Sequence, residues 1–224
     1  MSNLTLYHGS KKIISVPDIT KGVLYNDFGP GFYCCESPEN AGEWACHRGS
    51  GGFINRYVIE TDGLNILDLS SEHHTLMNWL AVVLENREFR ISSANVGRFV
   101  NHLKNYFRPD IEGSDIIIGT RCDDSNFSFV RLFLDEKLSY GQLMSLVRNG
   151  SAGAQVVIRS ERAYDRLRFE TCSRADADVY YPKRKKKDYN SRITCIAQME
   201  IGDRDGLFMH QLLREEVRPG DSRL

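Results

Sequence analysis

Short runs of alternating apolar and polar residues predict β-strands early and late in the chain. The first run, residues 4–8 (LTLYH), is ended by Gly9 and Ser10, and we expect it in the centre of a sheet. The other predicted strands are residues 32–35, 53–60, 64–69, 114–119 (SDIIIG) and 155–159 (QVVIR).

Apolar residues at intervals of three and four predict helices through the middle of the chain, most clearly over residues 75–86. An earlier helix is expected to begin after Ser37 and to reach about His47, because serine caps a helix start and Pro38 fits the first helical position. Further helices are predicted at residues 96–107, 127–134, 140–148 and 160–167. This order indicates a mixed α+β fold and not a regular βαβ alternation.

Residues 11–31 contain Pro and Gly with little periodicity, which predicts a long surface loop of the kind that often forms a lid. The pattern weakens after Phe169, where residues 192–200 are compatible with a strand and 206–216 with a terminal helix. No repeat and no linker rich in Gly, Ser or Pro divides the chain. We therefore expect one domain over residues 1–224, with a core at about 4–170 and an extension at 171–224.

Charge and hydropathy argue against several classes of protein. The 29 basic and 30 acidic residues leave a net charge of −1, so no global field attracts nucleic acid or anionic lipid. No apolar stretch approaches the roughly 20 residues of a membrane span, and the first ten residues lack the layout of a signal peptide. We therefore expect a cytoplasmic protein that does not contact a membrane.

The cysteines and histidines show no metal-ligand spacing. No CxxC motif is present, and the adjacent Cys34 and Cys35 should point to opposite faces of a strand. Neither an HExxH motif nor paired Cys/His spacing occurs. We expect reduced thiols and no metal site.

Three fragments are candidates for chemistry: residues 7–10 (YHGS), residues 27–33 (DFGPGFY) and Gln155. Together with residues 115–119 (DIIIG) and the following Asp123-Asp124 pair, they resemble the DUF3990 family of bacterial proteins, a branch of the ADP-ribosyltransferase superfamily. The resemblance extends over about residues 4–170.

The resemblance implies an ADP-ribosyltransferase-like split β-sheet core with inserted and flanking helices, which binds NAD. His8 matches the histidine whose imidazole holds a ribose hydroxyl of the adenosine half, and the Gly9 backbone would meet the nicotinamide carboxamide. Tyr33 matches the aromatic residue that stacks on the nicotinamide ring. The implied NAD-binding set is His8, Gly9, Ser10, Asp27, Phe28, Gly29, Gly31 and Tyr33.

Gln155 stands where the superfamily usually carries a glutamate. Cleavage of the bond between nicotinamide and ribose passes through an oxocarbenium-like state, which a carboxylate stabilises better than an amide does. Glutamine can still bond the ribose hydroxyls, but it supplies no net charge. Either Gln155 positions the substrate while Asp123 or Asp124 supplies charge, or catalysis is slow or absent.

These residues also have ordinary structural explanations. A single histidine after a strand is usually a surface residue, and glycines in a loop can simply serve a tight turn. Asp27 could cap its own loop, and Asp123-Asp124 could be a solvated turn. The run 183–187 (KRKKK) is flanked by tyrosines, so it is either a solvated face or a contact for nucleic acid.

The predicted function is transfer of ADP-ribose from NAD to a macromolecular acceptor, with a protein as the favoured acceptor and nucleic acid as the alternative. Two other functions compete with it. The glutamine at position 155 favours a non-catalytic module that binds NAD or ADP-ribose, and water could replace the acceptor in an NAD glycohydrolase.

Overall fold

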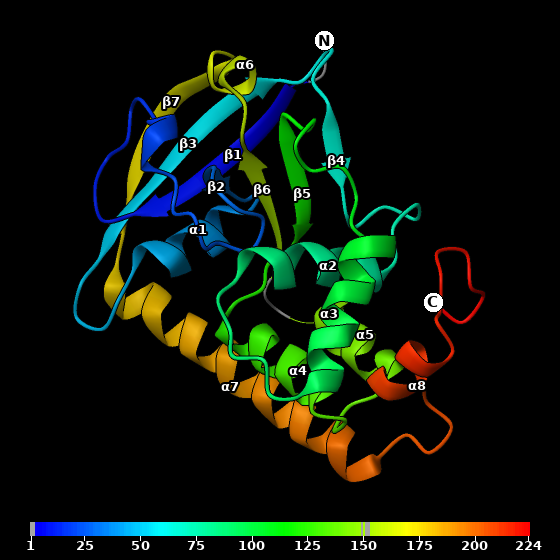
Figure 1. Cartoon of the computed structure of the whole chain (residues 1–224). Coiled ribbons are helices and arrows are strands. Elements are labelled where there is room, and N and C mark those ends of the chain that lie inside the picture. The colour runs from blue at the N-terminus through cyan, green and yellow to red at the C-terminus, as the bar shows by residue number, and fades with distance from the viewer. Residues whose placement is uncertain (1–2, 149, 151–152) are drawn as a thin grey trace.

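The computed structural model describes residues 3–148, 150 and 153–224, and its strands form two sheets (Figure 1). A three-stranded antiparallel sheet has the order β1-β3-β7, and a four-stranded sheet has the order β2-β6-β5-β4, in which only the β4–β5 pair is parallel. The strands are β1 (Asn3–Ser10), β2 (Phe32–Cys34), β3 (Gly52–Glu60), β4 (Ile66–Asp68), β5 (Ile116–Thr120), β6 (Ala154–Ile158) and β7 (Leu167–Ala175).

One backbone bridge joins the two sheets. Tyr7 of β1 and Cys35 exchange N–H···O bonds of 2.7 and 2.9 Å. The expectation that β1 lies in the centre of a sheet is therefore wrong, because β1 pairs along its length with β3 on one side only. Among the described residues, its backbone pairing with the second sheet is limited to this bridge. The chain turns away after Cys35 because Ser37 caps the next helix by accepting the Asn40 N–H, and the sheets diverge there.

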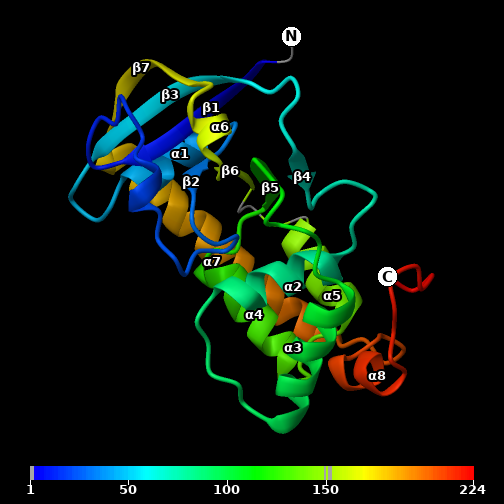
Figure 2. The same cartoon turned by 45° about the horizontal axis from the view of Figure 1, so that its top comes forward.

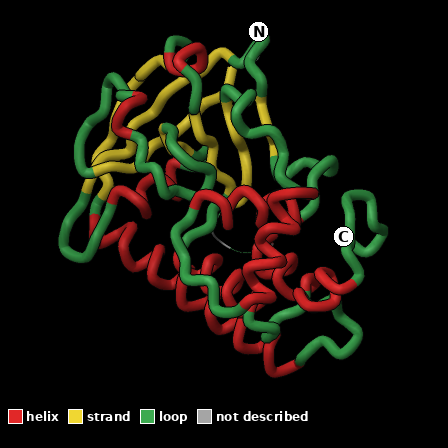
Figure 3. Tube along the Cα trace, viewed as in Figure 1, coloured by secondary structure: helices red, strands yellow, loops and turns green. Residues whose placement is uncertain are grey.

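Most of the helices gather on one side of the strands (Figures 1 and 3). The largest apolar cluster packs the middle helices against Phe28 and against Ile117 of β5. Periodicity predicted the middle helices to within a few residues, because each buries one broad apolar face. They are α2 (Leu76–Asn86), α3 (Ala94–Tyr106), α4 (Asp124–Leu134) and α5 (Tyr140–Arg148). The earlier helix, α1 (Pro38–Ala45), was predicted from its capping residues.

The C-terminal third departs from the sequence-based expectation. Strand β7 was not predicted, and residues 192–200 belong to the long helix α7 (Ala177–Ile201) instead of a strand. Only Cys195 of α7 is buried, so the helix carries little amphipathic signal. The two remaining α-helices are short. Helix α6 (Glu161–Tyr164) precedes β7, and α8 (Met209–Arg214) follows α7.

Helix α7 runs from the β-sheet half of the molecule to the helical half (Figures 1 and 2). It packs against α1 at one end and against α4 and α5 further along. Close packing with α1 requires Gly42, because a Cβ there would lie 2.5 Å from the Tyr180 ring. No helix within the described residues is both long and apolar enough for a membrane span.

Candidate functional site

A cleft of about 340 Å³ opens where the two sheets diverge. Strand β2 ends with Cys34 opposite Val156, so Gln155 is the first residue of β6 beyond the segment that pairs with β2. Because side chains alternate along strands, Gln155 shares a face with Val157 and its partner Tyr33. The sequence-predicted residues that line this cleft are His8, Gly9, Asp27, Tyr33, Asp123, Asp124 and Gln155.

The histidine of the cleft is held by the neighbouring strand. His8 Nδ1 lies 2.7 Å from the carbonyl oxygen of Tyr33, and its ring lies 4.5 Å from that of Phe32. A carbonyl oxygen only accepts, so Nδ1 carries the proton and Nε2 keeps a lone pair. Burial lowers the pKa of His8, although the bond to Tyr33 opposes this. The neutral imidazole therefore offers Nε2 as an acceptor for a hydroxyl group.

Gly9 is required by the helix that crosses it. A Cβ at this position would lie 1.9 Å from the carbonyl oxygen of Ala41 in α1. The backbone groups of Tyr7 point to Cys35, and those of Gly9 point to the same side of β1 because this direction alternates along a strand. Gly9 thus directs its backbone toward the gap between the sheets.

The Tyr33 hydroxyl fastens the loop that borders the cleft. It accepts the Phe28 N–H at 3.0 Å and donates to the Gly29 carbonyl at 2.6 Å. Burial raises the pKa of this phenol, so it stays protonated. Its ring remains along the cleft wall.

Asp27 and Gln155 form a buried pair at the base of the cleft. Asp27 Oδ2 accepts the Cys122 N–H at 2.9 Å and the Gln155 amide at 2.8 Å, and Oδ1 lies 3.4 Å from Nε of Arg87. Burial raises the pKa of Asp27 against the opposing effect of these bonds. Because Gln155 Nε2 donates to Asp27, its Oε1 is the group left to accept a bond.

The two acidic residues after β5 differ in their surroundings. Asp123 caps α4 by accepting the Asn126 N–H at 2.9 Å. Asp124, in the first turn of the same helix, is exposed at the rim of the cleft. Because the Asp123 carboxylate already accepts a hydrogen bond from the helix backbone, Asp124 is more available to contact a ligand.

Four predicted residues lie beside the cleft and support its walls. Ser10 donates to the Lys12 carbonyl, and Phe28 is fully buried against Gly119, where a Cβ would lie 2.8 Å from the ring. Gly29 has a φ of 78° and accepts the Tyr33 hydroxyl. Gly31 packs against β6, because a Cβ there would meet Val157 at 2.5 Å.

Sequence reasoning missed the cationic residues of the cleft. Arg87, Arg121 and Arg184 line it together with Trp44. Arg87 ends α2, Arg121 lies between the DIIIG fragment and Asp123-Asp124, and Arg184 belongs to the basic run 183–187. The sequence alone did not indicate that these three arginines come together. Within the described residues, no three His, Cys, Asp or Glu side chains gather as metal ligands.

A family model described as "Protein of unknown function (DUF3990)" matches residues 4–169. The chain belongs to the DUF3990 family. No curated protein matches the chain. No solved structure matches it either.

The DUF3990 segment contains most of the cleft. His8, Tyr33 and the Asp27–Gln155 pair fall within it, whereas Arg184 lies beyond its end. Strand β7 also continues to Ala175, past the matched residues. The cleft of this DUF3990 protein is therefore completed by its C-terminal extension.

Proposed function

We propose that this protein is an ADP-ribosyltransferase that transfers ADP-ribose from NAD to a macromolecular acceptor and releases nicotinamide. The observation that carries the proposal is the convergence of His8, Tyr33 and Gln155 from three strands on one cleft at the divergence of two sheets. The cleft volume of about 340 Å³ lies within the range of ligand pockets, roughly 300–1,000 Å³.

The binding roles follow from the groups that each residue has available. His8 Nε2 accepts a ribose hydroxyl, because Nδ1 is engaged by Tyr33. The backbone of Gly9 meets the carboxamide, and the Tyr33 ring packs on the nicotinamide. The deep position of His8 and Tyr33 supports a substrate with polar sugar edges and a flat aromatic group.

The reaction breaks the bond between ribose C1′ and the nicotinamide nitrogen, which leaves with the bonding electrons. An acceptor oxygen or nitrogen then bonds to C1′ and loses its proton to a base. Gln155 Oε1 accepts a ribose hydroxyl, and Asp27 behind it adds negative charge near the developing cation. Asp124 at the rim is the candidate base for the acceptor's proton.

A second candidate function is a non-catalytic module that binds NAD or ADP-ribose. The Asp27 carboxylate favours this alternative, because it is already bonded to Cys122, Gln155 and Arg87. A carboxylate so engaged has less charge to offer a transition state. Hydrolysis of NAD by water remains the third outcome of the same test.

Incubation of the pure protein with labelled NAD separates these functions. We expect nicotinamide release together with transfer of label to protein in a cell extract, and loss of the transfer in Asp124→Asn, because that variant lacks the base for the acceptor's proton. Release without transfer would indicate a glycohydrolase. NAD binding without release would favour the binding module.

The six free cysteines are compatible with a reducing compartment such as the cytoplasm, where we propose the acceptor is met.

A further inference from the structure

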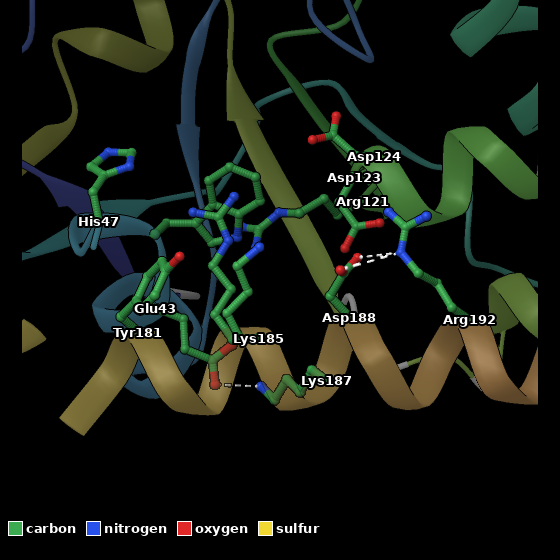
Figure 4. A pocket seen from close by; sticks show the side chains of 12 residues that line it. Glu43, His47, Arg121, Asp123, Asp124, Tyr181, Lys185, Lys187, Asp188 and Arg192 are labelled. Carbon is green, nitrogen blue, oxygen red and sulfur yellow. Dashed lines mark hydrogen bonds and ion pairs between the residues drawn. The ribbon is translucent and has the colours of Figure 1, made fainter. Parts of the chain in front are cut away.

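A second hollow, of about 310 Å³, lies beside the cleft between α1, the turn after β5 and α7. Figure 4 shows Asp188 and Arg192 of α7 extending toward the side where Arg121 and the Asp123-Asp124 pair lie. The residues that line both spaces are Trp44, Arg121, Asp123, Asp124 and Arg184. The two hollows therefore share a border.

Two guanidinium groups converge at this border. Arg121 lies over the Trp44 ring at 4.7 Å from its centre, and Arg184 lies over the same ring at 4.2 Å. Arg121 follows β5 directly, whereas Arg184 comes from α7. Removal from water lowers the pKa of Arg121, partly offset by Cys35, Asp123 and Asp27. Two like charges at one ring repel each other, and an anion between them would relieve that repulsion.

The other charges of the second hollow largely neutralise one another. Lys187 pairs with Glu43 at 2.7 Å, and Arg192 pairs with Asp188 at 3.3 Å (Figure 4). Among the described residues, no carboxylate lies within ion-pair distance of Arg121 or Arg184.

The remaining acids of this hollow face the two arginines and Lys185. Asp123 already caps α4, and Asp124 stands at the rim. Asp123 and Asp124 line the border as well, but the two guanidinium groups there lie over the Trp44 ring and neither forms an ion pair among the described residues.

We propose that Arg121 and Arg184 form an anion subsite for the diphosphate of a dinucleotide, which α7 completes. Planar guanidinium groups match phosphate oxygens in pairs of hydrogen bonds. The diphosphate joins the two nucleosides of NAD, so its binding group must border the cleft that contains His8 and Tyr33. The assignment to NAD rests on the proposed function, whereas the affinity for a diphosphate does not.

The test compares two neighbouring residues of α7 in the full chain. Arg184→Gln removes a charge at the border, and Lys183→Gln removes one beside it. Lys183 pairs with Glu39 and lines neither hollow. Calorimetry would measure binding of ADP-ribose, inorganic pyrophosphate and nicotinamide riboside, which lacks phosphate. Thermal melting would check that each variant folds.

We expect Arg184→Gln to weaken ADP-ribose binding by about tenfold or more, the scale of a lost charged hydrogen bond. Its binding of nicotinamide riboside should equal that of the wild type, and Lys183→Gln should resemble the wild type for every ligand. Arg121→Gln, if it folds, should repeat the effect of Arg184→Gln.

Four results would overturn the subsite. Unchanged ADP-ribose binding by Arg184→Gln together with a lower melting temperature would show that the stacked arginines hold α7 in place and do not bind an anion. An equal loss of ADP-ribose affinity in Arg184→Gln and Lys183→Gln would indicate nonspecific electrostatic attraction by the basic surface. Loss of single-stranded oligonucleotide binding alone would assign the arginines to nucleic acid. Absence of any diphosphate binding by the wild type would also contradict it.

The outcome is separable from that of the proposed function. If ADP-ribose binding depends on Arg184 but NAD is never cleaved, the subsite stands and the transferase fails. If Arg184→Gln transfers ADP-ribose from NAD with the same KM as the wild type, the transferase stands and the subsite fails.

Discussion

The glutamine at position 155 is half of a buried pair with Asp27, and this changes what a substitution there should do. The two side chains meet at 2.8 Å although 128 residues separate them in the chain. A carboxylate at position 155 would face the Asp27 carboxylate with burial already raising the pKa of Asp27. Like charges at that distance disfavour ionisation of both groups.

Gln155→Glu is therefore expected to destabilise the protein by about 1–3 kcal/mol, the cost of a buried group that loses its partner. The gain in nicotinamide release that a carboxylate at this position would otherwise give should be absent. The double variant Asp27→Asn with Gln155→Glu restores one acid and one amide, and should recover most of the stability. Urea unfolding gives the free energy of each variant. An unchanged unfolding midpoint in Gln155→Glu would contradict the pairing.

His8 should make the stability of the fold depend on pH in a defined direction. Burial holds its folded pKa below the ordinary histidine value of 6.5. Between 6.5 and that lower value the unfolded chain binds a proton that the folded chain does not, so the free energy of unfolding falls as pH falls.

The comparison is between wild type and His8→Gln at about pH 7.5 and about pH 5.5, a range that includes the unperturbed histidine pKa. The wild type should lose more stability on acidification than the variant, because only it carries this linked proton. Chemical denaturation at both pH values measures the difference. An equal loss in the two proteins would place the His8 pKa at its ordinary value.

At the scale of the elements, α1 and β1 are in backbone contact. The helix begins after Ser37 and crosses β1 at Gly9, where its Ala41 carbonyl leaves no space for a side chain. The same helix contacts α7 through Gly42. Helix α1 is thus fitted between the sheet and α7 by two glycines.

Gly9→Ala is expected to cost about 2–4 kcal/mol, because backbone atoms of α1 must move to admit the methyl group. Gly97→Ala in α3 is a matched control, since the nearest atom to its Cβ lies 3.6 Å away. That change should stabilise the protein by about 0.5–1 kcal/mol, as alanine does within a helix. Denaturation of both variants tests the prediction. A neutral Gly9→Ala would show that α1 is not held against β1.

The whole molecule depends on chain beyond residue 169, where the family match ends. Strand β7 pairs with β3 along its length to Ala175, and α7 contacts α1, α4 and α5. An end at residue 169 would leave only the first three of the nine residues of β7, whereas an end at residue 175 would keep the strand and remove α7.

The full chain should unfold in one transition, as expected of a single domain. The chain ending at residue 169 should fail to fold cooperatively. The chain ending at residue 175 should melt at least about 10 °C lower, because several kcal/mol of packing against α7 are lost. Circular dichroism during heating measures all three. Two separate transitions in the full chain, or an unaltered melting temperature at residue 175, would refute this dependence.

Local sequence was sufficient for most elements. The sequence predicted several elements to within a few residues: strands at 53–60 and 155–159, and helices at 75–86 and 140–148. Each of them buries one face or one short apolar run in the core. Ser37 and Pro38 predicted a helix start, because a serine cap and a proline at the first position act within the first turn of the helix. His8, Tyr33 and Gln155 were recognised through the family resemblance, and they lie in one cleft.

Other features depended on contacts between distant residues. The place of β1 at a sheet edge follows from the divergence of the two sheets beyond the Tyr7–Cys35 bridge, and β7 and α7 are too exposed to leave a clear period. The Asp27–Gln155 pair and the two arginines at Trp44 join side chains from separate elements. Periodicity records whether a residue is buried, but not which residue buries it. Partner choice is therefore a property of the folded chain.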